Sequence, residues 1–185
     1  MKGRETHQKI ELYPARRAHA ASIARMSRDL IEQGLGWTWK SARVERALAA
    51  SDTLAVVASR GKQMLGFAIM TCGEERAHLV LFAVSPQARR TGLGSRLLAW
   101  LEACAIDAGV SQITLEVRAT ARDARAFYEA RGFEPVRLLH GYYQKREHGV
   151  AMQKDLLTVP SGMLEPEQED PLAYIFANAA RGGEG

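Results

Sequence analysis

The residues best suited to chemistry form a short basic loop between an apolar run and a helical pattern. Residues 79–84 are apolar, with β-branched and aromatic members, and are long enough for one buried strand that ends before Pro86. The loop that follows consists of Arg89, Arg90, Thr91, Gly92, Leu93, Gly94 and Ser95. Its amide groups and the first turn of the next helix point the same way, and the glycines let a ligand approach the backbone. The stretch therefore predicts a phosphate site, to which Arg89 and Arg90 add charge.

Three kinds of phosphate loop compete for this stretch. A P-loop needs Lys and then Ser or Thr after its last glycine, whereas Ser95 and Arg96 follow here. The dinucleotide fingerprint needs a small residue at position 97, where Leu97 stands. The third pattern, Arg/Gln-x-x-Gly-x-Gly/Ala, is satisfied by residues 89–94. It resembles the pyrophosphate loop of the GNAT acetyltransferases and so implies acetyl-CoA (coenzyme A) as the cofactor. The alternative is that the two glycines form only a tight connection before the helix and bind no phosphate.

The elements that must position this loop follow from the apolar periodicity. Helices are predicted over residues 18–31, 41–50, from the basic loop to 108, and 122–130, and strands over 10–13, 53–59, 65–72, 77–84, 112–117, 133–138 and 150–154. Short turns join the second, third and fourth strands into an antiparallel meander. A helix connects the fourth strand to the fifth, so these two should be parallel. The order predicts a mixed α/β sheet, and a ligand can enter where its two parallel strands separate.

The composition limits the classes of protein to which the chain can belong. The chain has 185 residues, of which 46% are hydrophobic and 25% charged, as in an ordinary globular domain. We find no apolar run of the ~20 residues that span a membrane and no secretory segment. Cys72 and Cys104 lack metal-ligand spacing, so we expect buried thiols in the cytoplasm, no metal site and no membrane association. The net charge of +4 suits a polyanionic cofactor and does not require nucleic acid.

A second motif narrows the family. Residues 115–133, LEVRATARDARAFYEARGF, resemble the Leu-Glu-Val-Arg-Ala-Ser-Asn … Leu-Tyr … Gly-Phe pattern of the ribosomal-protein alanine N-acetyltransferases within GNAT. Residues 141–143 and 147–152 are similar to the ending of that subfamily. The resemblance covers roughly residues 10–157. It implies the GNAT fold, a mixed and mostly antiparallel sheet splayed between strands four and five with flanking helices. We expect an acetyltransferase domain over residues 1–157 and an extension over 158–185, either flexible or a short docking helix.

Acyl transfer from a thioester to an amine needs a base for the amine and an acid for the thiolate. Strand alternation sends Glu116 to the face opposite Leu115 and Val117, near the expected splay. There it could take the proton of the amine; a salt bridge to Arg118 or another surface charge is the alternative. Tyr128, on the following helix, could protonate the departing thiolate, or could simply form an aromatic core pair with Phe127.

The resemblance also implies contacts along the rest of the site. Backbone contacts to the pantetheine are implied for Phe82, Ala83 and Val84. Ala121 replaces an Asn that normally bonds the cofactor in the subfamily, and His148 replaces an Asp of the substrate-facing ending. We interpret Trp37 and Trp39 as lining an acceptor pocket or as packing a helix pair onto the sheet. Tyr142 and Tyr143 either line the acceptor mouth or pack at a hairpin rim.

The predicted function is acetyl-CoA-dependent N-acetylation, by direct transfer, of a primary amine on a protein N-terminus, a lysine or a small molecule. A non-catalytic acyl-CoA sensor of the same fold is the alternative. A nucleic-acid binder using Arg89, Arg90, Arg96 and Arg118 is disfavoured, because these side chains gather at one loop and few aromatic residues interleave with them. Many relatives dimerise, so a homodimer is kept as a candidate state.

Overall fold

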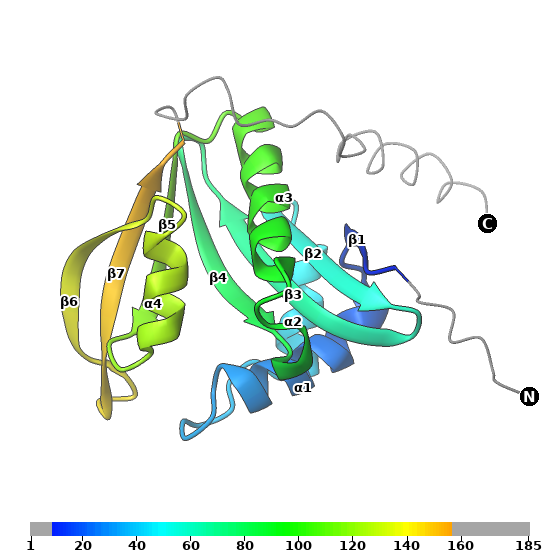
Figure 1. Cartoon of the computed structure of the whole chain (residues 1–185), viewed down its shortest axis with the longest axis horizontal. Helices are drawn as coiled ribbons and strands as arrows, with labels where there is room; N and C mark the ends of the chain where they lie inside the picture. Colours follow the sequence, from blue (N-terminus) through cyan, green and yellow to red (C-terminus); the bar gives the residue numbers. More distant parts are fainter. Residues whose placement is uncertain (1–8, 157–185) are drawn as a thin grey trace, which may run out of the picture.

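The chain is built on a single seven-stranded sheet with helices on both of its faces (Figure 1). The computed structural model describes residues 9–156; the predicted extension over 158–185 therefore lies outside the described residues. The strands are β1 (Glu11–Pro14), β2 (Thr53–Arg60), β3 (Gln63–Cys72), β4 (Arg76–Val84), β5 (Gln112–Arg118), β6 (Glu134–Tyr143) and β7 (Glu147–Asp155). The helices are α1 (Ala20–Leu30), α2 (Ser41–Ala49), α3 (Leu93–Asp107) and α4 (Arg122–Glu129), with 3-10 turns η1 (Arg17–His19) and η2 (Pro86–Ala88).

The strand order is β1-β2-β3-β4-β5-β7-β6, and every neighbouring pair is antiparallel except β4 and β5. This confirms the predicted mixed α/β sheet, the antiparallel meander and the parallel pair joined by a helix. The prediction ended the sixth strand at residue 138, but β6 runs to Tyr143. Pro135 does not end the strand because β6 is the edge of the sheet, and the proline lies at a shift of register against β7.

The parallel pair explains why the sheet opens. β4 and β5 share only three residue pairs, Arg76↔Gln112, Ala77↔Ile113 and His78↔Thr114. Beyond them β4 stays with β3, whereas β5 stays with β7. The two strands therefore diverge toward their carboxyl ends, and the predicted splay is confirmed.

A bulge in β4 changes which face its side chains occupy. The register against β3 shifts so that Leu81 opposes Ile69 and Leu79 opposes Met70, which leaves Val80 as the extra residue. Before the bulge Leu79 packs in one core, and after it Leu81 packs in the other. The bulge thus turns Phe82 toward the side of the sheet that carries α3 and α4.

Two apolar cores hold the sheet between its helices. The first lies under α3 and α4, on the near face in Figure 1, and contains the predicted apolar stripe Leu97, Leu98, Leu101 and Ala105. α3 packs so closely on β3 that a Cβ at Gly66 would lie 2.9 Å from Leu97 Cδ1. The second core lies under α1 and α2 and includes Ile23, Val44 and Phe67. Both faces are therefore fixed, and the open end of the β4–β5 pair lies between the two layers.

Candidate active site

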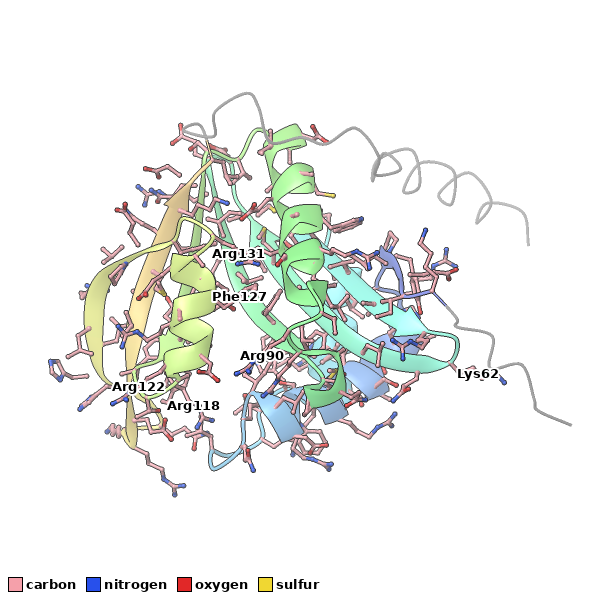
Figure 2. The ribbon with its side chains drawn as sticks, viewed as in Figure 1. Lys62, Arg90, Arg118, Arg122, Phe127 and Arg131 are labelled. Carbon is pink, nitrogen blue, oxygen red and sulfur yellow. The ribbon has the colours of Figure 1, made fainter. Side chains whose placement is uncertain are left out.

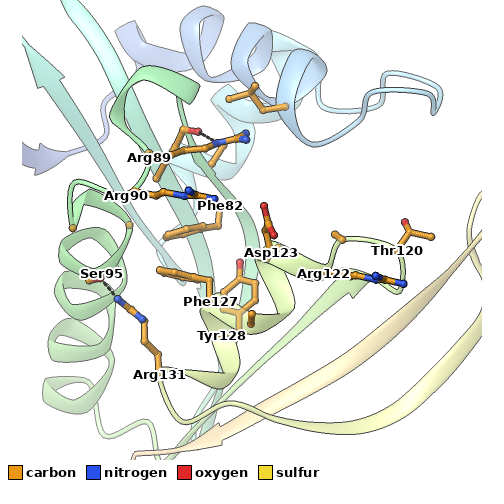
Figure 3. Close-up of a pocket in the computed structure, with 18 residues that line it drawn as sticks. Phe82, Arg89, Arg90, Ser95, Thr120, Arg122, Asp123, Phe127, Tyr128 and Arg131 are labelled. Atoms are coloured by element: carbon orange, nitrogen blue, oxygen red, sulfur yellow. Dashed lines mark hydrogen bonds between the residues drawn. The ribbon is translucent and has the colours of Figure 1, made fainter.

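A cavity of about 900 Å³ opens where β4 and β5 diverge (Figure 3). The end of β4, the basic loop, the β5–α4 connection and α4 form its walls, and Leu30 at the end of α1 also reaches it. Every predicted cofactor residue lines it except Thr91 and Leu93. The side chain of Leu93 is 1% exposed because it packs in the first core, so only its backbone belongs to the loop. Thr91 instead fixes the loop, since its Oγ1 donates to Ala88 O at 2.8 Å.

The backbone of the basic loop leaves amide groups without helical partners. Gly92 caps α3 with φ of +82°, a conformation that strongly favours glycine, and Arg90 also has a positive φ of 60°. The first hydrogen bond into α3 runs from Arg96 N to Gly92 O at 3.1 Å. The amides of Leu93, Gly94 and Ser95 precede it and have no intrahelical acceptor. These groups at a helix N-terminus suit a phosphate.

Two aromatic rings leave little room for a side chain at position 94, where the sequence has Gly94. A Cβ there would lie 3.2 Å from Phe127 Cε2 and 3.7 Å from Phe82 Cζ. Phe82 and Phe127 stack with ring centroids 5.5 Å apart, so an aromatic pair joins β4 to α4 across the gap. The small residue at position 94 therefore allows α4 to approach the loop.

Tyr128 belongs both to the cavity wall and to an aromatic cluster. It is 7% exposed, and its ring lies 5.3 Å from that of Phe127 and 5.5 Å from that of Phe133, centroid to centroid. Burial is the main cause that raises the pKa of the Tyr128 phenol above its ordinary value. Its hydroxyl therefore stays protonated and can donate a hydrogen bond into the cavity.

Glu116 does not line this cavity; it projects from the opposite face of β5. Its Oε2 lies 3.1 Å from His78 Nε2, and the hydrogen bond from His78 is the largest cause that lowers the pKa of the Glu116 carboxyl. A further hydrogen bond from Tyr142 acts in the same direction. Arg118 is not the partner of Glu116, because it binds Glu147 from Nη1 to Oε1 at 3.0 Å. The contact with His78 corresponds to the other form of the predicted alternative, a salt bridge to a different side chain.

His78 was not predicted as a site residue, although it is a polar residue within the mostly apolar β4 and lies on the face opposite Ala77 and Leu79. Its Nδ1 lies 3.0 Å from Thr114 Oγ1, which in turn donates to Ala77 O at 3.2 Å. These contacts hold the His78 ring beside Glu116, and the tautomer of the imidazole decides which of its nitrogens donates.

Arg118 ties three segments together beside Glu116. Besides Glu147, it donates from Nη2 to Ile31 O at 2.7 Å and to Gln33 O at 2.8 Å. The guanidinium also lies 5.8 Å from the ring centroid of Tyr143. The end of α1 is thereby anchored to β5 and β7.

The β6–β7 hairpin makes a second tie to the α1–α2 connection. Gln144 accepts from Gly36 N at 2.9 Å and donates from Nε2 to Gly36 O at 3.1 Å. A Cβ at Gly36 would lie 3.0 Å from that Nε2, so a side chain there would have to shift the Gln144 amide. Tyr142 and Tyr143 precede the turn, and Tyr142 is 50% exposed. Both lie on the side of Glu116: Tyr142 hydrogen-bonds the Glu116 carboxyl, and the pKa of Tyr143 is raised by burial and then by the charges of Tyr142 and Glu116.

Of the two tryptophans, Trp39 has the contacts of the packing interpretation, whereas Trp37 is exposed and belongs to neither core. Neither lines the cavity. Trp39 packs against the second core with the Arg43 guanidinium 4.1 Å from its ring centroid, and Trp37 Nε1 donates to Trp39 O at 3.1 Å. The buried Glu32 carboxylate fixes this connection by accepting from Thr38 N at 2.7 Å and Trp39 N at 3.1 Å. The two tryptophans therefore help to fix the conformation of the α1–α2 connection, which Arg118 and Gln144 also bind.

The remaining histidine of the substrate-facing ending stays within its hairpin. His148 Nδ1 accepts from Gly141 N at 3.0 Å, and its ring lies 5.0 Å from that of His140, centroid to centroid. Within residues 9–156, no group of three or more His, Cys, Asp and Glu side chains could hold a metal ion. None of the helices in this range is long and apolar enough to cross a membrane.

The sequence is similar to a known domain family and to curated acetyltransferases. The acetyltransferase (GNAT) domain model matches residues 26–156. The chain is 35% identical over 82 residues to an N-alpha-acetyltransferase of Saccharolobus solfataricus, covering 44% of this chain and 49% of that protein. It is 38% identical over 81 residues to the ribosomal protein bS18-alanine N-acetyltransferase of Escherichia coli K12, covering 44% of this chain and 55% of that one. The chain thus spans about half the length of the curated relatives it matches.

The fold has counterparts among solved structures. Arabidopsis thaliana NAA60 in complex with acetyl-CoA superposes with a TM-score of 0.70 at 15% sequence identity, covering 80% of this chain and 98% of that one. At this identity the likeness concerns the fold alone.

Proposed function

The chain belongs to the GNAT acetyltransferase family, and we propose that it transfers the acetyl group of acetyl-CoA directly to a primary amine. The observation that supports this proposal is the distribution of the site residues on the two sides of the diverging strands. The phosphate loop and Tyr128 lie on one side of the diverging strands, whereas the Glu116–His78 pair lies on the other. A thioester and an amine could therefore meet in the gap from opposite faces.

We assign the cofactor to the cavity because the residues present fit it. The amides of residues 90–95 would hold the diphosphate, and the exposed edge of Phe82–Val84 would face the pantetheine. Ala121 lines the cavity but has no polar side chain, so it cannot make the bond to the cofactor that the Asn of the subfamily makes. Other groups would have to supply that bond. When bound, acetyl-CoA supplies the acetyl thioester that the amine attacks.

The acid and base roles follow from the two environments. Glu116 would accept the proton of the amine, directly or through one water, and the hydrogen bond from His78 keeps Glu116 ionised over a wide pH range. Tyr128 would donate to the thiolate as the C–S bond breaks; its raised pKa suits a strong hydrogen-bond donor better than a free acid. No covalent enzyme intermediate is required, and neither Cys72 nor Cys104 lines the cavity.

The acceptor would approach between the α1–α2 connection and the β6–β7 hairpin, beside Tyr142 and Tyr143. Relatives named as acetyltransferases of a protein N-terminus support an amine of that class. We keep a lysine and a small-molecule amine as acceptors, with Trp37 and Trp39 shaping the approach. A cytoplasmic location and a homodimer remain part of the proposal. Figure 2 shows Lys62 on the β2–β3 hairpin, far from Arg90, Arg118 and Arg122, an arrangement that gives little support to a continuous nucleic-acid stripe.

The test is a thiol-release assay with acetyl-CoA against a panel of peptides with free N-termini, lysine-containing peptides with blocked N-termini, and small amines. We expect turnover with at least one class, and its loss in the pair Glu116→Gln and Tyr128→Phe. Calorimetry with CoA on the same proteins separates the alternative, because a sensor would bind CoA and release no thiol with any acceptor. Absence of CoA binding would remove the proposal altogether.

A further inference from the structure

We propose that Arg131 and Ser95 recognise the 3′-phosphate of coenzyme A, so that the protein distinguishes CoA from its 3′-dephospho form. The inference rests on the proposed function and concerns the opposite end of the cofactor from the thioester. It assigns a residue outside the phosphate loop to a specific group of the ligand.

The starting point is the set of four arginines that line the cavity, Arg89, Arg90, Arg122 and Arg131. The first three are exposed, and the Nε of Arg89 is turned back to Val84 O at 3.3 Å. Arg131 alone among them is half-buried. Figures 2 and 3 show it reaching from the end of α4 toward the first turn of α3, with Phe127 beside it.

Arg131 is held in place by two contacts. Its Nη2 donates to Ser95 Oγ, and its guanidinium carbon lies 4.4 Å from the centroid of the Phe127 ring. A guanidinium has five N–H donors in one plane. Stacking on the ring and bonding to Ser95 fix that plane while leaving further donors along its edge. Its orientation is thus set before any ligand arrives, which lowers the entropy cost of binding.

Ser95 becomes a donor in this arrangement. Because its Oγ accepts from Arg131, its own hydroxyl proton is left for another acceptor. A guanidinium edge beside a hydroxyl donor matches a phosphomonoester, which carries nearly two negative charges at pH 7 and three acceptor oxygens. The diphosphate does not need these groups, since the amides of the loop already serve it.

The direction of the cofactor assigns this pair to the nucleotide end. With the diphosphate at the loop, the thioester would lie at the splay, where Tyr128 lines the cavity and Glu116 lies beyond. An extended cofactor would then direct its nucleotide the other way, toward α3 and the end of α4. Ser95, Phe127 and Arg131 form the wall there, at the end of the cavity opposite Thr120 and Arg122 (Figure 3).

The experiment is calorimetric titration of the full-length protein with CoA and with 3′-dephospho-CoA. The wild type should bind CoA about 10- to 100-fold more tightly, the range of a charge-assisted bidentate contact. Arg131→Ala should lose most of that preference by weakening CoA binding while leaving dephospho-CoA affinity within about twofold. Arg131→Lys should keep part of the preference, because it keeps the charge without the planar donors.

The matched control is Arg122→Ala, which removes a cavity-lining arginine at the other end. It should change the affinities for both ligands by the same factor and so preserve their ratio. Circular dichroism and thermal melts of each variant identify any that fail to fold, and Ser95→Ala gives a second, smaller test of the same contact.

The outcomes separate the two proposals. If the wild type binds neither ligand, the proposed function fails and this inference with it. If CoA binds but the wild type does not prefer it, or if Arg131→Ala weakens both ligands equally, the 3′-phosphate assignment is wrong while the proposed function stands.

Discussion

The two sides of the splay are built in different ways. The cofactor side is formed mainly by two segments, residues 82–95 and 120–131, through backbone amides and stacked aromatic rings. The side of Glu116 is assembled from the α1–α2 connection, β4, β5 and the β6–β7 hairpin, and side-chain hydrogen bonds hold these parts together. One side is thus a local property of the chain, and the other exists only after the sheet has formed.

This difference implies that substitutions should fall into two groups. Changes on the cofactor side should alter CoA affinity, except at Tyr128, which is assigned to the chemical step. Changes on the Glu116 side should alter turnover or the acceptor KM. Variants that affect both quantities would show that the two sides are coupled more tightly than their separate construction suggests.

The largest effect is expected for Glu116→Gln. Loss of a general base typically costs about 10²- to 10⁴-fold in rate, so kcat should fall by that range while the Kd for CoA stays within about twofold. Single-turnover kinetics and calorimetry on the same preparation measure the two quantities. A parallel loss of CoA affinity would contradict the separation of the two sides.

On the cofactor side, Gly94→Val should weaken CoA binding. The new side chain must displace Phe127, which lies 3.2 Å from the Cβ position, and overpacking of this kind costs about 1–3 kcal/mol. We expect roughly a 10-fold rise in the Kd for CoA and an unchanged acceptor KM. Gly109→Ala is the control, since this glycine has a φ of +82° but lies away from the cavity. Its cost should appear in the melting temperature and not in CoA affinity.

The ties around the acceptor should have graded effects. Arg118→Gln removes hydrogen bonds to Glu147, Ile31 O and Gln33 O, and we expect a loss of about 1–3 kcal/mol in the free energy of unfolding together with a higher acceptor KM. Gln144→Ala removes two exposed bonds to Gly36 and should cost about 1 kcal/mol or less. Denaturant titrations rank the two, and an Arg118 variant with the milder effect would refute the ranking.

The smallest effect concerns pH. The pKa of Glu116 is lower in the folded protein than its ordinary value of 4.5, so its ionised form stabilises the fold at pH values above about 4.5. That contribution is lost as the pH falls through the folded-state pKa. His78→Gln removes the main cause, so the Glu116 pKa should move upward, as carboxyl-carbon NMR would record. No upward movement would mean that His78 does not set the acidity of Glu116.

Sequence patterns were sufficient for the local side of the site. The apolar run, the glycine spacing and the following helical period are all contained within residues 79–105, and the structure places them as a strand, a loop and a helix. The parallel pairing of β4 and β5 also followed, because a helix separates them along the chain.

On the other side Glu116, Tyr142 and Tyr143 were candidates from the sequence, but the contacts that bring them together could not be predicted from the same patterns. The pairing of His78 with Glu116 depends on β4 and β5 lying side by side at residues 78 and 114, and the link from Gln144 to Gly36 joins positions more than a hundred residues apart. β6 extends to Tyr143, further than the sequence predicted, because the pairing of Tyr143 with Glu147 of β7 continues the strand past Gly141. Such contacts are decided by tertiary packing.

The brevity of the β4–β5 ladder has a consequence for how the molecule responds to heat. Past His78 and Thr114 the facing edges of the two strands lack each other as hydrogen-bond partners. An extended ligand lying there would act as a temporary eighth strand, joining the two halves of the sheet that the backbone joins only at one end. Occupancy should then raise the melting temperature with the logarithm of ligand concentration, and slow amide exchange most along the open edges of these two strands.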